Sequence, residues 1–269
     1  MPKVKVSDIN MNYEEQGSGE PLILIPYTSA DYACYAFQTP EYSKYFTCYS
    51  VDPRGAGETD KPEGTYSTEQ YADDIAGFMQ AVGIEQAHIM GVSLGAATGM
   101  QIAAKYPDKV KSLSLHSGWT KTDPFLRTVV EGWQLAAKAM GNVAEMVIRY
   151  IFPWCFTPEL YAAKPDHIKA LSDFVRGRPA QPVDALIRQA NAVLSHDCES
   201  QLNKIKAPTL ITFGKYDMIT STTRFANIMK NNIKNSELVI FEGCAHAGLY
   251  ERIEEFNQRT LEFLKRHSG

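Results

Sequence analysis

The feature that most constrains the fold is a serine between two glycines, Gly91-Val92-Ser93-Leu94-Gly95. The preceding residues, 87–90, form an apolar run typical of a buried strand, and the following residues favour a helix that Pro107 ends. A serine on such a strand-to-helix turn has strained backbone geometry, and flanking glycines leave room for the turn to pack closely. The pattern predicts that the Ser93 hydroxyl is presented above a sheet; the alternative is a serine that only caps a helix.

Short apolar runs of the same kind recur along the chain and alternate with helical segments. Strands are expected at residues 22–25, 46–51, 87–90, 110–116, 209–213 and 238–241. Residues 4–13 alternate apolar and polar side chains, which predicts an antiparallel edge strand or hairpin. The clearest helix spans residues 67–82, where Ser67 and Gln70 form a capping box. This alternation predicts an α/β fold with a mostly parallel sheet and helices on both faces.

The alternation stops between residues 118 and 206, where helical patterns at 129–140 and 184–194 are separated by several prolines. An insertion of helices here would lie above the carboxyl ends of the strands, where ligands bind in open α/β sheets. The alternative is that the region contains further strands that the pattern does not reveal. We expect one domain over residues 1–269, with a core of residues 1–118 and 207–269 and a helical cap of residues 119–206.

An acid and a histidine follow two later strands. A serine hydroxyl needs a base to take its proton, and the base needs a group that fixes its tautomer. Asp217 follows the strand at 209–213, and His246 follows the strand at 238–241, so both are expected at the same sheet edge as Ser93. Taken singly, they could be a turn residue and a surface histidine. Their order along the chain, serine, acid, histidine, instead predicts a catalytic triad.

Length and charge limit the class of protein. The 269 residues are 44% hydrophobic, enough for one sizeable core. The net charge of -4 comes from 31 acidic and 27 basic residues that are mixed along the chain, so we expect neither a nucleic-acid nor a membrane partner. No apolar stretch has the length of a signal peptide or membrane span, which predicts a cytoplasmic location. The five cysteines are scattered and are expected to be reduced thiols, and the oligomeric state is left open.

The chain resembles the α/β-hydrolase superfamily over residues 17–263. Besides Ser93 and its two expected partners, residues 52–60, Asp-Pro-Arg-Gly-Ala-Gly-Glu-Thr-Asp, are similar to the D-x-R-G-x-G-x-S loop of that superfamily. The resemblance implies the α/β-hydrolase fold with an inserted helical cap. Serine rather than aspartate at position 93 argues against the haloalkane dehalogenase and epoxide hydrolase branches and leaves acyl transfer. The overall similarity is greatest to small capped bacterial esterases and enol-lactonases.

The resemblance also implies where a developing oxyanion would bind. The family usually has His-Gly after the third strand, whereas this chain has Pro26-Tyr27-Thr28-Ser29. The implied donors are the backbone amides of Thr28 and Leu94. Because Tyr27 replaces a glycine, its phenol either enters the pocket and contacts substrate or packs beneath the cap.

We therefore expect a serine hydrolase that cleaves a small carboxylic ester or lactone through an acyl-enzyme, with Ser93 as nucleophile, His246 as base and Asp217 orienting it. No metal or organic cofactor is expected, and the expected partner is a small-molecule substrate. His116 could also line the pocket. Aromatic residues in the cap suggest a largely apolar pocket: Trp119, Trp133, Phe152, Trp154 and Phe156.

Two other functions stay open at this point. The same three residues serve carbon–carbon bond hydrolysis of a ring-fission diketone, which an anion-binding arginine over the pocket would favour. The candidates in the cap are Arg127, Arg149, Arg176, Arg178 and Arg188. A ligand receptor on a hydrolase scaffold is an alternative of another class, in which the triad survives and turnover is negligible.

Overall fold

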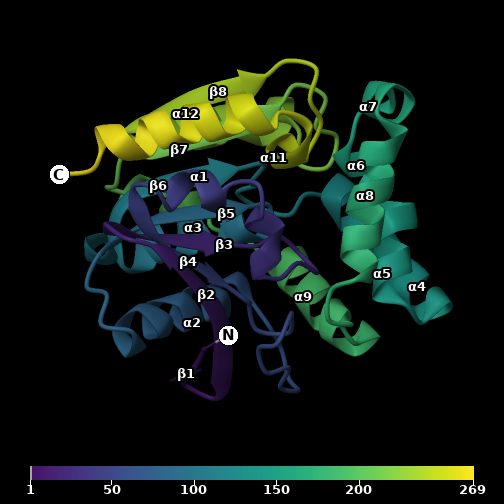
Figure 1. The fold of residues 1–269 in the computed structure, drawn as a ribbon, viewed down its shortest axis with the longest axis horizontal. Helices are drawn as coiled ribbons and strands as arrows, with labels where there is room; N and C mark the ends of the chain where they lie inside the picture. The colour runs from purple at the N-terminus through teal and green to yellow at the C-terminus, as the bar shows by residue number, and fades with distance from the viewer. Residues whose placement is uncertain (1) are drawn as a thin grey trace.

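An eight-stranded sheet forms the centre of the molecule in the computed structural model, which describes residues 2–269 (Figure 1). The strand order is β1-β2-β4-β3-β5-β6-β7-β8; β1 and β2 pair antiparallel with their neighbours and all other pairs are parallel. The strands are β1 (Lys3–Val6), β2 (Ile9–Gly17), β3 (Glu20–Ile25), β4 (Phe46–Val51), β5 (Ala87–Val92), β6 (Val110–His116), β7 (Thr209–Gly214) and β8 (Ser236–Phe241). The mostly parallel sheet and the antiparallel start are as predicted.

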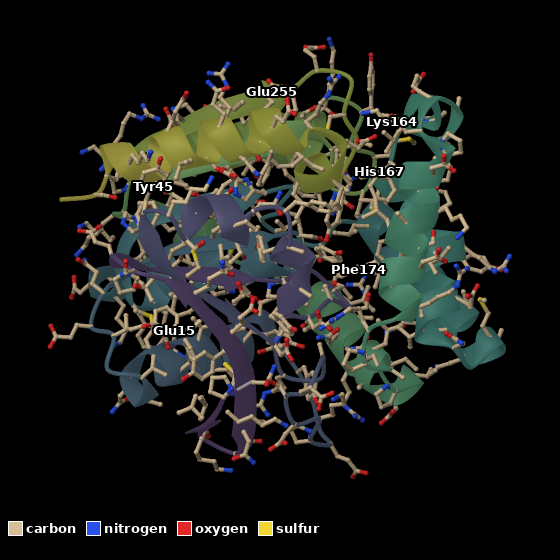
Figure 2. All side chains as sticks on the ribbon, viewed as in Figure 1. Glu15, Tyr45, Lys164, His167, Phe174 and Glu255 are labelled. Carbon is tan, nitrogen blue, oxygen red and sulfur yellow. The ribbon has the colours of Figure 1, made fainter. Side chains whose placement is uncertain are left out.

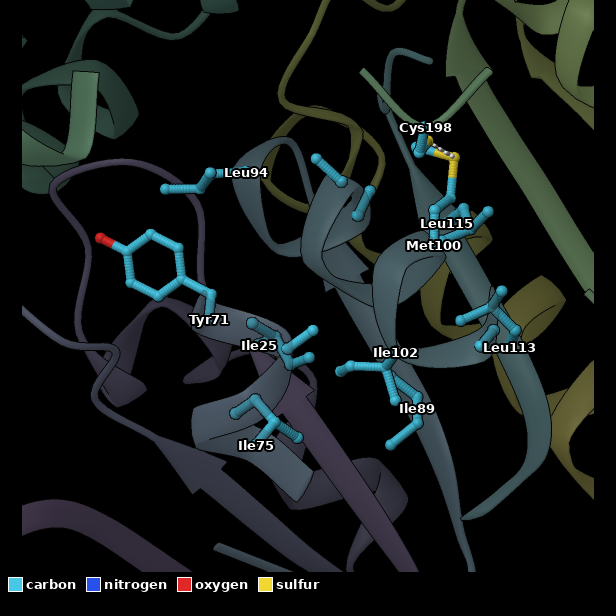
Figure 3. Close-up of a cluster of buried hydrophobic side chains, with 14 of the residues drawn as sticks. Ile25, Tyr71, Ile75, Ile89, Leu94, Met100, Ile102, Leu113, Leu115 and Cys198 are labelled. Carbon is cyan, nitrogen blue, oxygen red and sulfur yellow. Dashed lines mark hydrogen bonds between the residues drawn. The ribbon is translucent and has the colours of Figure 1, made fainter. Parts of the chain in front are cut away.

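Helices cover both faces because the central strands are apolar on both sides. Along β3, Ile23 packs into one buried cluster with helices α2 (Thr68–Ala81) and α3 (Leu94–Lys105). Leu24 packs into a second cluster with helix α12 (Ile253–Arg266). This alternation follows from the two-residue period of a strand. Figure 3 shows part of the first cluster, in which Ile102 of α3 lies beside Ile89 of β5.

The helices outside the insertion are short except for α2, α3 and α12. Ser67 caps α2 by accepting a hydrogen bond from the Gln70 amide (3.1 Å), as the capping box predicts. The α-helices are α1 (Thr39–Tyr42), α2 (Thr68–Ala81), α3 (Leu94–Lys105), α10 (Asn227–Asn232), α11 (Gly248–Glu251) and α12 (Ile253–Arg266). Short segments of 3₁₀-helix or π-helix are η1 (Tyr32–Tyr35), η2 (Pro107–Lys109), η4 (Glu199–Lys204) and η5 (Thr222–Ala226).

Between β6 and β7, before the 3₁₀ segment η4, six α-helices and one π-helical turn form a layer beside the sheet (Figure 1). We call them the helical cap: α4 (Pro124–Met140), α5 (Val143–Met146), η3 (Val147–Ile151), α6 (Phe152–Cys155), α7 (Pro158–Ala163), α8 (Pro165–Arg176) and α9 (Val183–Ser195). Within residues 119–206 the only β pairing is an isolated bridge between Lys121 and Asp197, so this part of the chain contains no strand. The cap boundaries at residues 119 and 206 remain a prediction.

No helix within residues 2–269 is both long enough and apolar enough to cross a membrane.

Candidate active site

Ser93 occupies a strained turn between β5 and α3. Its φ of 53° and ψ of -114° are unfavourable for a residue with a side chain. The turn is held by the Ser93 amide, which donates to the carbonyl of His116 at the end of β6 (2.9 Å). Side chains on the flanking glycines would collide with backbone, since a Cβ on Gly91 would lie 2.1 Å from the Gly95 oxygen. A Cβ on Gly95 would lie 2.1 Å from the Ile25 oxygen at the end of β3.

Asp217 lies on the loop after β7 and is 3% exposed. Its Oδ1 accepts from the amides of Ile219 (2.9 Å) and Thr220 (3.0 Å), and its Oδ2 accepts from the Thr220 hydroxyl (2.8 Å). Burial alone would raise the pKa of Asp217, but the interaction with His246 and the bonds from Thr220 hold this pKa below its ordinary value. The carboxylate is therefore the stable form at neutral pH.

His246 lies on the loop after β8 and hydrogen-bonds to Asp217 through Nδ1, 2.9 Å from Oδ2. Because a carboxylate only accepts, Nδ1 donates this bond, and Nε2 of the neutral ring is left as a proton acceptor. Ser93 and His246 line the same cavity. No hydrogen bond joins their side chains within residues 2–269; looser contacts between a nucleophile and its base are common without a ligand.

The cavity beside Ser93 has a volume of about 60 Å³ and is mainly apolar. Of the cap aromatics named from the sequence, Trp133, Phe152 and Phe156 line it. Trp119 is instead buried in the core, and Trp154 packs against Phe125 with ring centres 6.4 Å apart. The other apolar lining side chains are Val92, Val147, Ile151, Ile219, Ala247 and Leu249.

The loop after β3 contributes Tyr27 and Thr28 to the wall of this cavity. Leu94 is the first residue of α3. Its backbone amide therefore has no hydrogen-bond acceptor within the helix, as is true of the first amides of any helix. The Tyr250 hydroxyl donates to the Cys34 carbonyl (2.8 Å), so the Tyr27 hydroxyl must donate to Tyr250 (2.9 Å). Tyr27 therefore lines the cavity with its phenol already engaged.

Ser117 and Thr220 support the histidine and its acid, and neither was predicted from the sequence. The Ser117 hydroxyl donates to the His246 carbonyl (2.8 Å), and Ser117 has a positive φ of 50°. The Thr220 hydroxyl lies 2.8 Å from Asp217 Oδ2 and 3.1 Å from the Ser117 carbonyl. Both residues follow the ends of predicted strands, β6 and β7, which is the only sequence signal that could have drawn attention to them.

Gln189 of cap helix α9 holds the loop after β3. It is fully buried, and its Oε1 accepts from the Ser29 amide (3.0 Å) and from the Gln181 side chain (2.9 Å). Its Nε2 donates to the Arg54 carbonyl (3.2 Å). Ser29 has a positive φ of 64°, so this bond stabilises an unfavourable backbone geometry next to Thr28. No sequence pattern marks Gln189.

Glu251 joins the cap to the loop that carries His246. Its Oε2 accepts from the Ala245 amide (2.5 Å), and its Oε1 accepts from the amide (2.7 Å) and hydroxyl (2.8 Å) of Thr157. A second connection runs from the Ala247 amide to the Cys155 carbonyl (2.9 Å). Cap and histidine loop are therefore fixed relative to each other.

His116 does not line the Ser93 cavity, contrary to the possibility raised by the sequence. It is buried, Nδ1 lies 2.7 Å from the Thr212 hydroxyl, and the ring packs against Phe256. Burial lowers its pKa to about 3, so the ring is neutral.

The five cap arginines also lie outside the lining of this cavity. Arg127, Arg149 and Arg188 pair with acids on their own helical segments, whereas Arg176 and Arg178 line a neighbouring cavity. Within residues 2–269 no cluster of three or more histidine, cysteine, aspartate or glutamate side chains could hold a metal ion.

Comparison with known proteins agrees with this architecture. A family model described as the alpha/beta hydrolase fold matches residues 28–253. A putative carbamate hydrolase, RutD of Azorhizobium caulinodans, is 23% identical over 98% of both chains. A 2-hydroxy-6-oxo-6-phenylhexa-2,4-dienoate hydrolase of Comamonas testosteroni is 24% identical over 97% of this chain and 93% of its own.

Among solved structures, the enol-lactonase of Burkholderia xenovorans superposes with a TM-score of 0.89 at 22% identity, covering 98% of this chain and 100% of that one. At this identity the likeness establishes the fold alone. The family model spans most of the chain, and the mostly parallel sheet with helices on both faces agrees with the fold that it describes. The chain thus belongs to the alpha/beta hydrolase fold family.

Proposed function

We propose that the protein is a serine hydrolase that cleaves small carboxylic esters or lactones. The observation that carries the proposal is the arrangement around one cavity: Ser93 on its strained turn, and His246 with Nδ1 bonded to a buried carboxylate. In this arrangement Asp217 fixes the tautomer that leaves Nε2 free to accept the Ser93 proton.

In the first half of the reaction, the Ser93 hydroxyl attacks the substrate carbonyl carbon while His246 takes its proton. The developing oxyanion is stabilised by the amides of Thr28 and Leu94, each worth about 3 kcal/mol in the transition state. His246 then donates its proton to the leaving alkoxide. In the second half, His246 deprotonates a water molecule that attacks the acyl-enzyme, and Ser93 is regenerated. This mechanism uses no metal or organic cofactor.

The substrate expected for the Ser93 cavity has a small apolar group next to the scissile carbonyl, because none of its lining residues is aspartate, glutamate, lysine or arginine. A cytoplasmic location and the absence of nucleic-acid and membrane partners remain predictions from sequence.

Carbon–carbon bond hydrolysis is the second candidate function. The relative from Comamonas testosteroni, whose name denotes a dienoate hydrolase, supports this candidate. Its sequence similarity extends over nearly the whole chain. The same serine, histidine and aspartate would serve this reaction, so the site geometry alone does not separate the two. A ligand receptor on this scaffold is a third candidate, for which slow turnover and ligand-dependent destabilisation would be the signature.

The test is hydrolysis of p-nitrophenyl esters from acetate to octanoate by wild type, Ser93→Ala and the control Ser195→Ala, whose serine lies at the end of α9 outside the cavity. We expect turnover of short esters by wild type and the control, and loss of turnover in Ser93→Ala. Turnover of a ring-fission diketone but of no ester would favour the second candidate. Undiminished ester turnover by Ser93→Ala would refute the proposal.

A further inference from the structure

The mainly apolar wall of the Ser93 cavity contains a pair of hydrogen-bonded phenols. Tyr27 comes from the loop after β3 and Tyr250 from α11, and their hydroxyl oxygens lie 2.9 Å apart. Both residues line the Ser93 cavity, and Tyr27 also lines a neighbouring cavity of about 270 Å³. Because Tyr27 directly precedes Thr28, a substrate bound in the Ser93 cavity can meet this pair close to its scissile carbonyl.

Each phenol has one proton to donate, and both protons are already used. Burial raises the pKa of Tyr27 and of Tyr250 well above the ordinary value for tyrosine, so both phenols stay neutral. The Tyr250 hydroxyl donates to the Cys34 carbonyl, which can only accept, and Tyr250 therefore accepts the Tyr27 proton. Within residues 2–269 no group donates to the Tyr27 oxygen, so its remaining capacity is that of an acceptor.

The surroundings of Tyr250 hold the two phenols in this order. Its ring packs edge-on against Tyr27 and Phe37, with ring centres 6.4 and 6.1 Å apart. His167 of α8 lies 3.2 Å from the Tyr250 carbonyl, on the side of the cap that faces the core (Figure 2). If the bond between the phenols were reversed, the buried Cys34 carbonyl would lose its Tyr250 donor, which is unfavourable in a buried place.

An acceptor oxygen at this point of the wall selects among substrates. A hydroxyl or N–H of the substrate can donate to Tyr27, whereas an ether or ketone oxygen would meet it with no proton between the two. The hydroxyl-bearing residues Thr28 and Ser29 also line the cavity. A hydroxyl that can rotate serves as donor or acceptor, so these two favour neither kind of group.

We propose that the Tyr27 oxygen accepts a hydrogen bond from a hydroxyl or N–H of the substrate near its scissile carbonyl. The preferred substrate is then a small ester or lactone that carries such a donor, rather than one that carries only acceptor oxygens. This inference rests on the proposed function of Ser93 and narrows the substrate class.

The experiment uses two sets of three esters of similar size. In each set one ester carries a hydroxyl, one carries only an acceptor oxygen and one, the neutral ester, carries neither. The acyl set is p-nitrophenyl 3-hydroxypropanoate, methoxyacetate and butanoate. The alcohol set is the acetates of 3-(1-hydroxyethyl)phenol, 3-acetylphenol and 3-isopropylphenol.

The measured quantities are the hydroxyl ratio and the acceptor ratio, each the kcat/KM of that ester divided by the kcat/KM of the neutral ester in its set. Since both are ratios within one variant, they do not depend on the fraction of folded protein. The variants are Tyr27→Phe, Tyr250→Phe, the double variant Tyr27→Phe/Tyr250→Phe and a control, Tyr150→Phe. Tyr150 lies in the cap outside both cavities and is 48% exposed.

For at least one set, Tyr27→Phe should lower the hydroxyl ratio about fivefold, because one neutral hydrogen bond is lost, and Tyr150→Phe should leave it unchanged. In Tyr250→Phe the Tyr27 proton loses its acceptor and becomes free to donate, so the acceptor ratio of that set should rise. The rise should disappear in the double variant. An unchanged hydroxyl ratio in both sets would overturn the proposal. So would an equal loss of kcat/KM for all esters in Tyr27→Phe, because the phenol would then serve the oxyanion.

Binding to Ser93→Ala gives a readout that does not depend on turnover. In calorimetric titrations, adding Tyr27→Phe should weaken binding of the hydroxyl ester about fivefold relative to the neutral ester, in at least one set. Equal effects on both esters, with ester turnover by wild type intact, would overturn the donor site and leave the proposed function standing. Absence of ester turnover by wild type, with binding of the hydroxyl ester still dependent on Tyr27, would count against the proposed function alone.

Discussion

Replacing Gln189 by leucine should damage catalysis from a position on the cap that does not line the Ser93 cavity. The substitution removes the acceptor of the Ser29 amide while keeping an apolar side chain of similar size. Ser29 would lose the bond that stabilises its φ of 64°, and the loop carrying the Thr28 amide would be free to relax.

The expected magnitudes follow from the bonds that are lost. The Arg54 carbonyl keeps a donor, the Tyr71 hydroxyl (3.1 Å), so the main cost is the unpaired Ser29 amide. One part-buried unpaired amide costs about 1–3 kcal/mol of folding stability. Complete loss of one oxyanion donor costs about 3 kcal/mol in the transition state, so partial displacement of Thr28 should lower kcat roughly tenfold to a hundredfold.

The assay pairs urea unfolding with p-nitrophenyl acetate kinetics in wild type, Gln189→Leu, Gln189→Glu and the control Gln134→Leu. Gln189→Glu keeps an oxygen for the Ser29 amide, so kcat should stay near wild type although stability falls. Gln134 lies on α4 and bonds only within the cap, so its replacement should leave kcat unchanged. If Gln189→Leu keeps kcat within about twofold of wild type, then the cap does not position the loop that carries the Thr28 amide.

Three further predictions concern the turn, the buried histidines and the acid. Gly95→Ala should fail to fold or lose several kcal/mol because its Cβ meets a backbone carbonyl, whereas Gly132→Ala, in open space on α4, should gain about 1 kcal/mol in urea unfolding. Burial lowers the pKa of His116 to about 3 and of His196 to about 4, so the unfolded chain binds more protons below pH 6.5. The free energy of unfolding should fall by up to about 1.4 kcal/mol per pH unit for each as the pH drops from 6.5 to 4, and a pH-independent midpoint would contradict this. Asp217→Asn should lower kcat roughly a thousandfold or more at pH 7, because an amide can donate to Nδ1 and stabilise the wrong tautomer.

The sheet could be predicted because each central strand is a short apolar run between turn-forming residues. When helical segments lie on both sides of such a run, a buried strand is the simplest interpretation of it. The bounds predicted for β4 match the structure at both ends. The sequence also placed Ser93, Asp217 and His246 after β5, β7 and β8. Parallel strands end at the same edge of a sheet, so the three residues were expected to lie close to one another.

The supporting contacts could not be predicted because they depend on how the cap lies over the core. Gln189 reaches Ser29 across 160 positions, and Glu251 reaches Thr157 across 94. Helical periodicity gives the buried face of α9 but not the loop against which it packs. Tyr27 is a similar case, because its bond to Tyr250 depends on the placement of α11.

Covalent labelling of the intact protein with a fluorophosphonate, followed by mass spectrometry of its peptides, tests directly whether Ser93 is an activated nucleophile. We expect a single adduct on the peptide containing Ser93, formed rapidly in wild type and at least a hundredfold more slowly in a folded His246→Gln variant. Failure of the reagent to label Ser93 in folded wild type, or equal labelling rates with and without His246, would contradict the assignment of Ser93 as a nucleophile activated by this histidine.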